Sequence, residues 1–397
     1  MEPAVLVINA GSSSVKYQLV DPGTGHSYAR GFVERIGLDG GLLHHTVDGT
    51  THDRQVDVPD HTTAVALVSR AFATHGPDLG GVDLLAVGHR VVHGGDDFAD
   101  PALITQEVLA AVERLVPLAP LHNPGNLQGI RATQEQFPDV PQVAVFDTAF
   151  HQTMPPAAST YAVPRSWREE HKVRRYGFHG TSHAYVSRRA AALLGRPLEE
   201  VASVILHLGN GASATAVDGG RSVDTSMGLT PLEGLVMGTR PGDVDPGLAG
   251  HLADRAGLSA EDFDRALSKE SGLLALAGSA DMRQVQELRA AGDPDAALAL
   301  EVVVHRLLHY VGAYAAVLGR LDALVFTAGI GENDAELREA VVARLGGFGL
   351  ELDPAANTEG SGERRISTAA SRVAVLVVPT NEEWEIARQV AQVVSGG

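Results

Sequence analysis

The sequence predicts an α/β protein with two domains that share one architectural theme. At 397 residues the chain is too long for one ordinary hydrophobic core, so two domains are expected. Residues 5–20 and 204–217 each read as an apolar strand, a turn rich in Asn, Gly and Ser, and a second strand. This repetition indicates a duplicated domain. Later units of strand, glycine-rich loop and helix are typical of an α/β fold.

The opening segment, VLVINAGSSSVKYQLV, predicts a hairpin that binds phosphate. Val5–Ile8 is a continuous, mostly β-branched run, which is typical of a strand buried on both faces. The turn that follows from Asn9 offers backbone N–H groups, hydroxyls and an amide. Lys16 is one of only three lysines among 31 basic residues, and a compact charge at this place suits a phosphate. The alternative is a lysine that merely extends from a strand edge.

Composition excludes several classes of function. The net charge of −18 argues against nucleic acid and anionic membranes as partners. No uninterrupted apolar run reaches the roughly 18 residues of a membrane helix, and the first residues lack the pattern of a secretion signal. The absence of Cys excludes disulfides, thiolate metal sites and cysteine catalysis. It also fits a reducing, cytoplasmic location.

The first half of the chain continues as an alternation of strands and helices. The patterns predict an extended segment at 27–35, a polar hairpin within 44–58, helices at 63–75, 105–115 and 127–137, and strands at 82–87 and 140–146. A glycine-flanked loop at 88–95 and Asp147 follow the two strands, where open α/β sheets place ligands. Asp147 fits a contact to a ligand or its metal and equally a cap of the next turn. A domain boundary is expected near residue 150.

The second half repeats this organisation. The patterns predict a helix at 184–194, the strand pair within 204–217, a strand at 323–327 with a glycine loop at 328–333 and a helix at 335–345, and a strand at 373–378 before a helix at 384–394. Gly209, Gly211 and Ala214 match a relaxed dinucleotide fingerprint. That fingerprint needs a helix directly after the glycines, whereas a strand is predicted there, so a Rossmann site is not favoured. No Walker A motif is present.

Two histidine pairs have the i, i+4 spacing of zinc ligands on a helix, namely His89/His93 and His179/His183. Neither pair has the glutamate of an HExxH motif. His179, between Phe178 and Gly180, is better interpreted as a hydrogen-bond donor facing a ligand, with a structural histidine as the alternative.

Charged residues in restricted loops complete the candidates. Arg90 lies in the glycine-flanked loop expected at 88–95, and Arg240 is flanked by Gly and Pro residues that restrict its backbone, so both contexts suggest a site. Thr380 and Glu383 have the spacing of a capping box, which would tie Glu383 to the start of the following helix. Glu382 is then the carboxylate left to face a metal, although the choice between Glu382 and Glu383 stays open.

Taken in chain order, these segments resemble the signature blocks of the acetokinase family, in the acetate and sugar kinase/Hsp70/actin superfamily. The blocks are VLVINAGSSSVKYQLV, GHRVVHGG, LAPLHNP, VAVFDTAFH, YGFHGTSH, VILHLGNGAS, GLVMGTRPGDVDPG, FTAGIGEN and PTNEE, between about residues 5 and 390. The resemblance implies two duplicated ribonuclease H-like (actin-like ATPase) domains with a nucleotide and substrate cleft between them. One would comprise residues 1–150 with 382–397, and the other residues 151–381.

The resemblance also implies roles for individual residues. Arg90 would bind the acetate carboxylate, His179 and Arg240 would stabilise the phosphoryl group, and Asp147 would be the essential acid. Asn9 and Glu382 would hold Mg²⁺. The remaining positions are Val92, Leu121, Phe178 and Pro231 for the methyl pocket, His122 beside the phosphoryl group, and Lys16, His207, Leu208, Gly209, Asn210, Gly211, Asp281, Met282, Arg283, Gly329, Ile330, Gly331, Glu332 and Asn333 for the nucleotide. Met282 stands where relatives often carry an aromatic residue.

The implied activity is reversible transfer of the γ-phosphoryl group of ATP to acetate, which gives acetyl phosphate and ADP. The family resemblance implies Mg²⁺, with Mn²⁺ as a substitute, and a homodimer. Acetate is already ionised at neutral pH, so the reaction needs positioning and charge neutralisation more than a strong base. Propionate or butyrate kinase is an alternative, because one methylene changes binding by only about 1–3 kcal/mol. A nucleotide-switched binding protein, like actin or Hsp70, is the alternative from another class.

Overall fold

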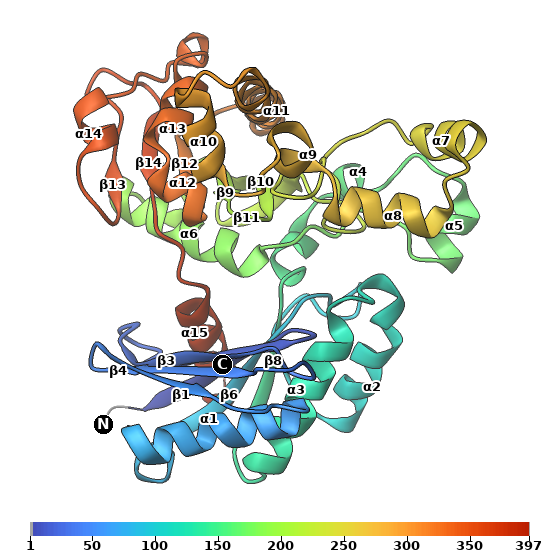
Figure 1. Ribbon diagram of the computed structural model, residues 1–397. Coiled ribbons are helices and arrows are strands. Elements are labelled where there is room, and N and C mark those ends of the chain that lie inside the picture. The colour runs from blue at the N-terminus through green and yellow to red at the C-terminus, as the bar shows by residue number, and fades with distance from the viewer. Residues whose placement is uncertain (1–2, 397) are drawn as a thin grey trace. The chain divides into compact units, whose positions relative to one another are not determined.

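The computed structural model describes residues 3–396, and over this range the chain divides into two compact units (Figure 1). The first unit contains residues up to Gln152 together with the segment from Asn381 onward, and the second contains Thr153–Thr380. Each unit is built on one β-sheet with helices packed against it.

The first unit contains an eight-stranded sheet within the described residues. Its elements are β1 (Ala4–Ala10), β2 (Ser14–Val20), β3 (Ser27–Glu34), β4 (Leu42–Val47), β5 (Thr50–Gln55), α1 (His61–His75), β6 (Leu84–Val91), β7 (Ala102–Leu103), α2 (Gln106–Arg114), α3 (Asn123–Gln136), β8 (Gln142–Phe146) and α15 (Glu382–Val394). The strand order is β5-β4-β3-β2-β1-β6-β8-β7. Strands β1 to β5 form an antiparallel meander, and β6 and β8 continue parallel to β1.

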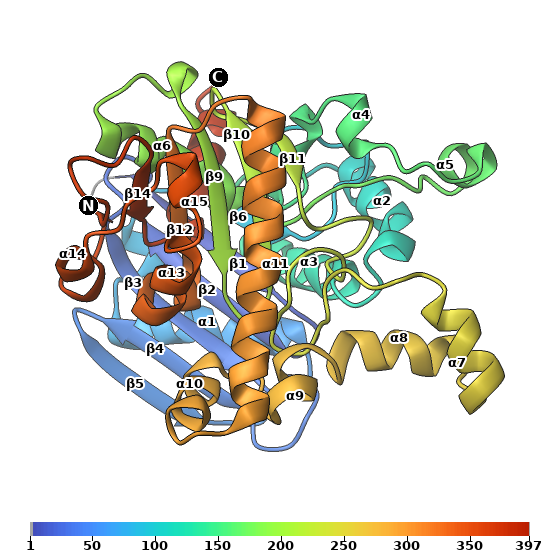
Figure 2. The same ribbon diagram turned by 90° about the horizontal axis from the view of Figure 1, so that it is seen from above.

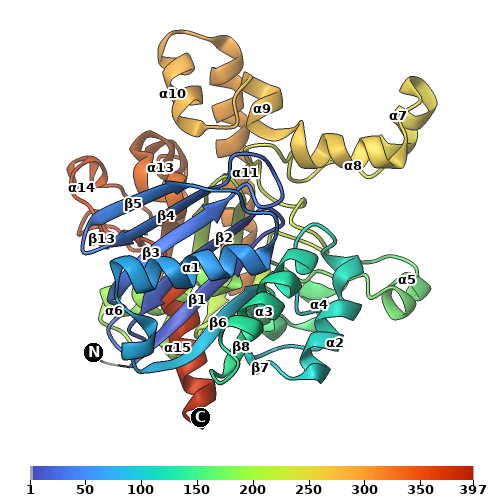
Figure 3. The same cartoon turned by 60° about the horizontal axis from the view of Figure 1, so that its bottom comes forward.

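Strand β1 is buried on both faces, as its apolar run predicts. Its residues alternate between faces: Leu6 and Ile8 pack in the core under α1, whereas Val5 and Val7 pack in the core under α15. Figure 3 shows α1 lying across the strands, and Figure 1 shows α15 on the opposite face. The central strand is therefore covered from both sides and has a fixed place in the unit.

Helix α15 belongs to the core of the first unit although 381 residues precede it. Ile386, Ala387 and Val390 pack on the apolar face of β1, β6 and β8. The indole N–H of Trp384 donates to the carbonyl oxygen of Pro22 at 3.0 Å. The start of α15, with its acidic residues, is thereby held against the first sheet.

The second unit contains a six-stranded sheet within the described residues. Its elements are α4 (Pro156–Ser159), α5 (Arg165–Glu170), α6 (Gly180–Leu194), β9 (Ala202–Leu208), β10 (Ala212–Asp218), β11 (Arg221–Thr225), α7 (Leu248–Ala256), α8 (Ala260–Lys269), α9 (Gly272–Ala277), α10 (Met282–Ala290), α11 (Pro294–Leu318), β12 (Ala323–Thr327), α12 (Ala328–Asn333), α13 (Ala335–Val342), α14 (Pro354–Thr358), β13 (Arg364–Arg365) and β14 (Ala374–Val377). The order is β11-β10-β9-β12-β14-β13.

The two sheets share one topology. In the first, β3-β2-β1 is an antiparallel meander that continues into parallel β6 and β8. In the second, β11-β10-β9 is an antiparallel meander that continues into parallel β12 and β14. The architectural duplication predicted from residues 5–20 and 204–217 is present in both strand order and strand direction.

Helix α11 is the one helix among residues 3–396 that is long and apolar enough to cross a membrane by length and composition. Glu301, His305 and Arg306 interrupt its apolar sequence. One side packs against β9, β10, α9, α10 and α13, and Figure 2 shows the helix lying across the strands of its unit. Leu298 and Val317, on the other side, are 52% and 55% exposed. This arrangement is typical of a core helix with one outward face.

Three expected loops fold differently. Residues 88–91 continue strand β6, because they pair in parallel with both β1 and β8. Position 88 within this strand requires glycine, because a Cβ there would stand 2.7 Å from a methyl group of Val390 in α15. Helix α3 begins at Asn123 with a proline in its first turn, so the loop between the helices expected at 105–115 and 127–137 is shorter than expected. The glycine loop at 328–333 forms the short helix α12.

His89 consequently points into the core of the first unit, not into a loop. Its Nε2 hydrogen-bonds the Oε1 of Gln142 at 2.8 Å, and only 2% of the residue is exposed. Burial lowers its pKa to about 4, and the bond to Gln142 opposes this only in part. The ring is therefore neutral in the folded protein at neutral pH.

The buried His89 makes the stability of the first unit pH-dependent. In the unfolded chain histidine titrates near 6.5, whereas the folded pKa is about 4. Between these values the unfolded state binds the extra proton. The contribution of His89 to the free energy of unfolding is therefore retained in full above pH 6.5. The free energy of unfolding then falls by about 3 kcal/mol as the pH drops toward 4. Urea unfolding followed by Trp384 fluorescence, in a Trp167→Phe background, measures this loss.

His89→Gln should flatten that part of the pH dependence, whereas the same change at the exposed His171 should leave it intact. Equal pH slopes for His89→Gln and the parent would contradict the assignment.

Candidate active site

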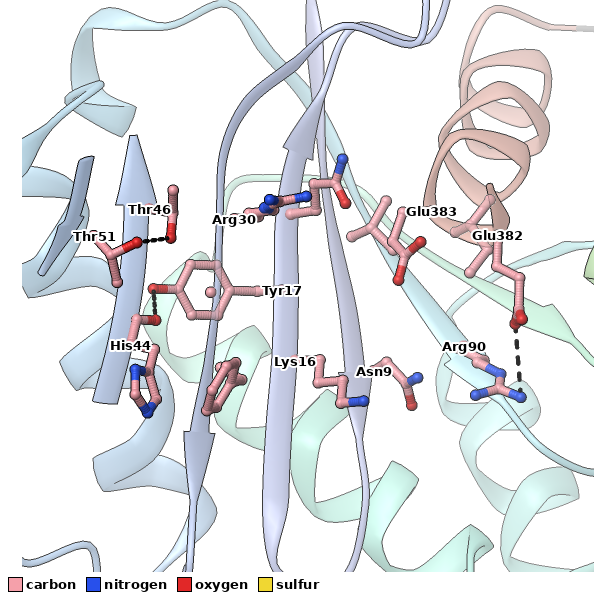
Figure 4. A pocket seen from close by; sticks show the side chains of 15 residues that line it. Asn9, Lys16, Tyr17, Arg30, His44, Thr46, Thr51, Arg90, Glu382 and Glu383 are labelled. Carbon is pink, nitrogen blue, oxygen red and sulfur yellow. Dashed lines mark hydrogen bonds and ion pairs between the residues drawn. The ribbon is translucent and has the colours of Figure 1, made fainter. Parts of the chain in front are cut away.

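A pocket of about 550 Å³ lies on the α15 side of the first sheet, a size typical of small-molecule sites. It gathers Asn9 from β1, Lys16 from β2, Arg90 from β6, and Glu382 and Glu383 from α15. Figure 4 shows Lys16, Asn9 and Arg90 side by side across the strands, with Glu383 and Glu382 apart from them at the start of α15. An amide, an ammonium, a guanidinium and two carboxylates thus share one space.

The strand register explains this convergence. Asn9 and Lys16 are directly paired between antiparallel β1 and β2, so both side chains lie on the same face. In the parallel pairing of β1 with β6, Ile8 lies beside His89. One residue further along each strand, Asn9 and Arg90 point to the opposite face, toward α15.

Arg90 and Asp147 form an ion pair at the ends of β6 and β8. The guanidinium Nε lies 3.0 Å from one carboxylate oxygen of Asp147 and Nη2 lies 2.6 Å from the other. The Arg90 side chain is 21% exposed and that of Asp147 is 2% exposed. Burial lowers the pKa of Arg90, but the charges of Asp147 and then Glu382 raise it by more. Asp147 therefore orients a permanently charged guanidinium, and a carboxylate bound in this way is a poor base.

The two carboxylates of α15 have different surroundings. Glu382 lies 3.8 Å from the Nη2 of Arg90 and is one-fifth exposed. Figure 4 shows the Glu383 carboxylate above the strands and that of Glu382 turned toward Arg90. Burial, and next the charge of Glu382, raise the pKa of Glu383. The carboxylate of Glu382 is the one that forms the ion pair with Arg90.

The capping box expected at Thr380 and Glu383 is wrong. Helix α15 begins at Glu382, and its cap is Asn381, whose side-chain oxygen accepts the backbone N–H of Trp384 at 3.0 Å. Asn is among the residues most favoured at the N-cap, and Thr380 lies one residue before this cap position. The Thr380 hydroxyl instead bonds Ser182.

Helix α3 packs against the turn between β1 and β2. The side-chain amide of Asn126 donates to the carbonyl of Ala10 at 2.6 Å and its oxygen accepts the N–H of Val92 at 3.0 Å. A Cβ on Gly125 would stand 2.7 Å from the backbone of Gly11, so only glycine allows this approach. Asn126 was missed in the sequence, although an Asn two residues after a Pro at a helix start is a usable signal.

In the second unit, His179 and Arg240 converge on Gly211. A Cβ placed on Gly211 would lie 2.9 Å from Arg240 Nη2 and 3.5 Å from His179 Nε2. Arg240 Nη1 donates to the carbonyl of Pro231 at 2.8 Å, and burial lowers the pKa of Arg240. Two side chains that can donate hydrogen bonds therefore face the turn of the second strand pair.

His207 stacks on His179. The two ring centroids are 4.2 Å apart with planes 21° from parallel. Ser182 Oγ lies 2.8 Å from the Nδ1 of His207, and Ser213 Oγ lies 2.9 Å from the Nδ1 of His179. Each ring thus has a serine at the same nitrogen, which fixes the ring orientation. Ser182 and Ser213 were not singled out in the sequence, because their partners lie 25 and 34 residues away.

A second pocket, of about 680 Å³, gathers most of the residues expected at the nucleotide. It is lined by Gly209, Asn210, Asp281, Met282, Arg283, Gly329, Ile330 and Asn333, and also by Gln286, Asp334, Ala335 and Glu336. Met282, the departure from the family pattern, is 4% exposed and packs into the wall. Asp281 caps α10 by accepting the N–H of Arg283 at 2.9 Å.

Gly331 and Glu332 do not line this pocket but belong to the helix α12 beside it. The buried guanidinium of Arg338 donates to both of their carbonyl oxygens, at 3.0 and 2.9 Å. The Glu332 carboxylate accepts the N–H of Thr380 at 3.2 Å. Arg338, absent from the sequence-based candidates, thus fixes the end of the short helix that carries Gly329 and Asn333.

The residues expected at the methyl pocket and His122 are distributed over the two units. Val92, His122 and Leu121 lie in the first unit, with Leu121 60% exposed, whereas Phe178 and Pro231 lie in the second, with Phe178 3% exposed. Their common role stays a prediction.

A sequence profile of the acetokinase family matches residues 4–388. The chain belongs to the acetokinase family. It is 57% identical to the acetate kinase of Leifsonia xyli subsp. xyli over 99% of this chain and 100% of that protein. The crystal structure of Porphyromonas gingivalis acetate kinase superposes with a TM-score of 0.94 at 44% identity, covering 99% of this chain and 100% of that one.

The same comparisons bear on the alternatives within the acetokinase family. A propionate kinase from Francisella tularensis subsp. tularensis superposes with a TM-score of 0.92 at 41% identity, over 98% of this chain and 99% of that one. One fold thus hosts kinases named for two acids. The predicted α/β fold of the actin-like superfamily and the prediction of a phosphotransferase of this family are confirmed. This excludes the switch protein of another class.

Replacement of Asp147 tests whether it orients Arg90. Asp147→Asn presents an N–H group to the guanidinium, so Arg90 loses a charge-assisted bond worth about 10–100-fold in kcat/KM. The Km of the carboxylic acid substrate should rise, while the Km of the nucleotide stays near its original value. Steady-state kinetics on purified protein measures both, with the exposed Asp139→Asn as the matched control. Near-full activity of Asp147→Asn would contradict the role.

Proposed function

We propose that this acetokinase-family enzyme phosphorylates acetate, by reversible transfer of the γ-phosphoryl group of ATP to give acetyl phosphate and ADP. The observation that carries the proposal is the pocket of the first unit, where Asn9, Lys16, Arg90 and Glu382 come together. Its positive groups suit two anions, a carboxylate and a phosphate, and its oxygen donors suit a hard cation.

The chemistry proceeds by direct, in-line transfer. The acetate carboxylate is ionised at neutral pH and is itself the nucleophile, so no base removes a proton. Its approach to a phosphate brings two anions together, and charge neutralisation lowers the barrier. Arg90, aimed by Asp147, holds the carboxylate, while His179 and Arg240 donate to the phosphoryl oxygens. Val92, Leu121, Phe178 and Pro231 enclose the methyl group, with His122 beside the phosphoryl group.

The first unit supplies the acetate-side groups and the second binds the nucleotide. The pocket lined by Gly209, Asp281 and Gly329 has the volume of a nucleoside site. His207, Leu208, Asn210, Gly211, Met282, Arg283, Ile330, Gly331, Glu332 and Asn333 complete this site, and Lys16 contacts phosphate.

Asn9 and Glu382 would hold Mg²⁺, or Mn²⁺ in its place, and the bound ion would neutralise phosphate charge. Among residues 3–396 no group of three or more His, Cys, Asp or Glu side chains is arranged to hold a metal ion. The amide oxygen of Asn9 and the carboxylate of Glu382 fit Mg²⁺, which keeps several waters and binds through one or two protein groups plus substrate phosphates.

The substrate is tested by hydroxamate trapping of the acyl phosphate. With ATP and Mg²⁺, acetate should give a kcat/KM about tenfold or more above propionate, and butyrate should be poorer still, since each added methylene must fit one apolar pocket. The three acids are compared side by side in one preparation. A preference for propionate would replace the proposed substrate, and no hydroxamate with any acid would refute acyl phosphate formation.

The metal ligand is tested with an isosteric pair on α15. Glu382→Gln should raise the Mg²⁺ concentration for half-maximal rate by about tenfold, because an anionic ligand becomes neutral. Glu383→Gln should change it less than threefold. Mn²⁺ binding followed by electron paramagnetic resonance gives a readout that is independent of turnover. If Glu383→Gln has the larger effect in both measurements, the metal ligand is Glu383.

We further propose a cytoplasmic homodimer. The outward face of α11, with Leu298 and Val317 about half exposed, offers apolar surface suited to a second copy. A chain without Cys is well adapted to a reducing compartment.

A further inference from the structure

Ser213 of β10 lies between two histidine rings of the second unit. Its Oγ is 2.9 Å from the Nδ1 of His179 and 2.8 Å from the Nε2 of His183. Ser213 and His183 are fully buried. The two histidines lie four residues apart at the start of α6, so both rings reach β10 from one helix face.

The donor and acceptor roles of Ser213 and the two histidines depend on one another. A serine hydroxyl has one hydrogen to donate and two lone pairs that accept. Ser213 can therefore donate to one ring only, and the other ring must donate to Ser213. Either His179 accepts from Ser213 while His183 donates to it, or His179 donates through Nδ1 while His183 either accepts or also donates.

Arg240 favours the first arrangement. Its Nη2 and the Nε2 of His179 lie within 3.5 Å of the same point above Gly211. A second positive charge there would be repelled by the guanidinium, which favours a neutral His179. A neutral ring can donate from Nε2 toward this point only if its Nδ1 carries no hydrogen and accepts from Ser213.

We propose that Ser213 and His183 are positioning residues that hold neutral His179 in the tautomer with its hydrogen on Nε2. His183 donates from Nε2 to Ser213, and Ser213 donates to the Nδ1 of His179. The inference rests on the proposed function in one respect, that the Nε2–H of His179 is a donor to the phosphoryl group in flight. This tautomer makes the Nε2–H donor available without a positive charge on the His179 ring.

The neighbouring ring and the backbone support this assignment. Ser182 Oγ lies between the Nδ1 of His207 and the hydroxyl of Thr380, both at 2.8 Å, so a second serine is bonded to the ring that stacks on His179. His179 also has a φ of 57°, a left-handed conformation that few residues other than glycine adopt. Such a strained conformation persists only where surrounding contacts stabilise it, and such residues cluster at functional sites.

Ser213→Ala tests the relay through the pH dependence of kcat. Without the serine donor, His179 loses its fixed tautomer when neutral but still donates from Nε2 when protonated. We expect kcat to fall about tenfold at pH 8.5 and by a smaller factor at the acidic end of the profile, where His179 takes up a proton. Ser187→Ala is the matched control, because it removes a buried hydroxyl that bonds only a carbonyl within α6. A pH profile of Ser213→Ala parallel to the wild type would overturn the proposal.

Two substitutions at His183 separate donation from packing. The amide nitrogen of His183→Gln can donate from near the position of Nε2, whereas His183→Leu removes the donor. His183→Gln should recover most of the alkaline activity that His183→Leu loses. Equal losses in both, with parallel pH profiles, would assign His183 to packing alone.

Nitrogen-15 NMR of histidine-labelled wild-type protein reads the tautomer directly and needs no substrate. The His179 signal is assigned by its loss in His179→Asn, a residue that tolerates the left-handed backbone. At pH 8, Nε2 should be the protonated nitrogen of His179, and a hydrogen on Nδ1 would overturn the relay. If the wild type forms no acyl phosphate while Nε2 carries the hydrogen, the proposed function fails and the tautomer assignment stands.

Discussion

The first unit depends on one ion pair, between Arg90 and Asp147. The pair exists because β6 and β8 are adjacent parallel strands, so the last residues of both meet at the same edge of the sheet. Removal of either partner would leave the other charge largely enclosed without compensation, which is costly in a protein interior. Orientation of the guanidinium and integrity of the sheet edge therefore rely on the same contact.

The elements of the fold that could be predicted from sequence are those with local signals. The apolar run Val5–Ile8 predicts a doubly buried strand, and the repeated strand–turn–strand pattern predicts the duplication. The cross-strand neighbours Asn9 and Lys16 follow from the hairpin itself, since a tight turn fixes the register of its strands. Glu382 was singled out at its helix start, and the resemblance to the family then added its pairing with Asn9 across the chain, which no local pattern could supply.

The features that escaped prediction depend on partners distant in sequence. Ser213 reads as an ordinary strand residue until α6 brings His179 and His183 against it. Residues 88–91 read as a loop because of their glycine, which is needed where α15 packs closely. At the start of α15 the cap is Asn381 and not Thr380, and this difference of one residue places Trp384 instead of Glu383 at the third helical position.

The place of α15 in the first unit also has a consequence for biosynthesis. All of Thr153–Thr380 leaves the ribosome before α15 does, so the second unit can complete its sheet while the first still lacks a layer. Until then Val5, Val7 and Val145 face water, and such exposed apolar surface makes an intermediate prone to aggregation. Nascent chains should accordingly need protection by chaperones until α15 has been synthesised, and Glu382 would reach Arg90 only then.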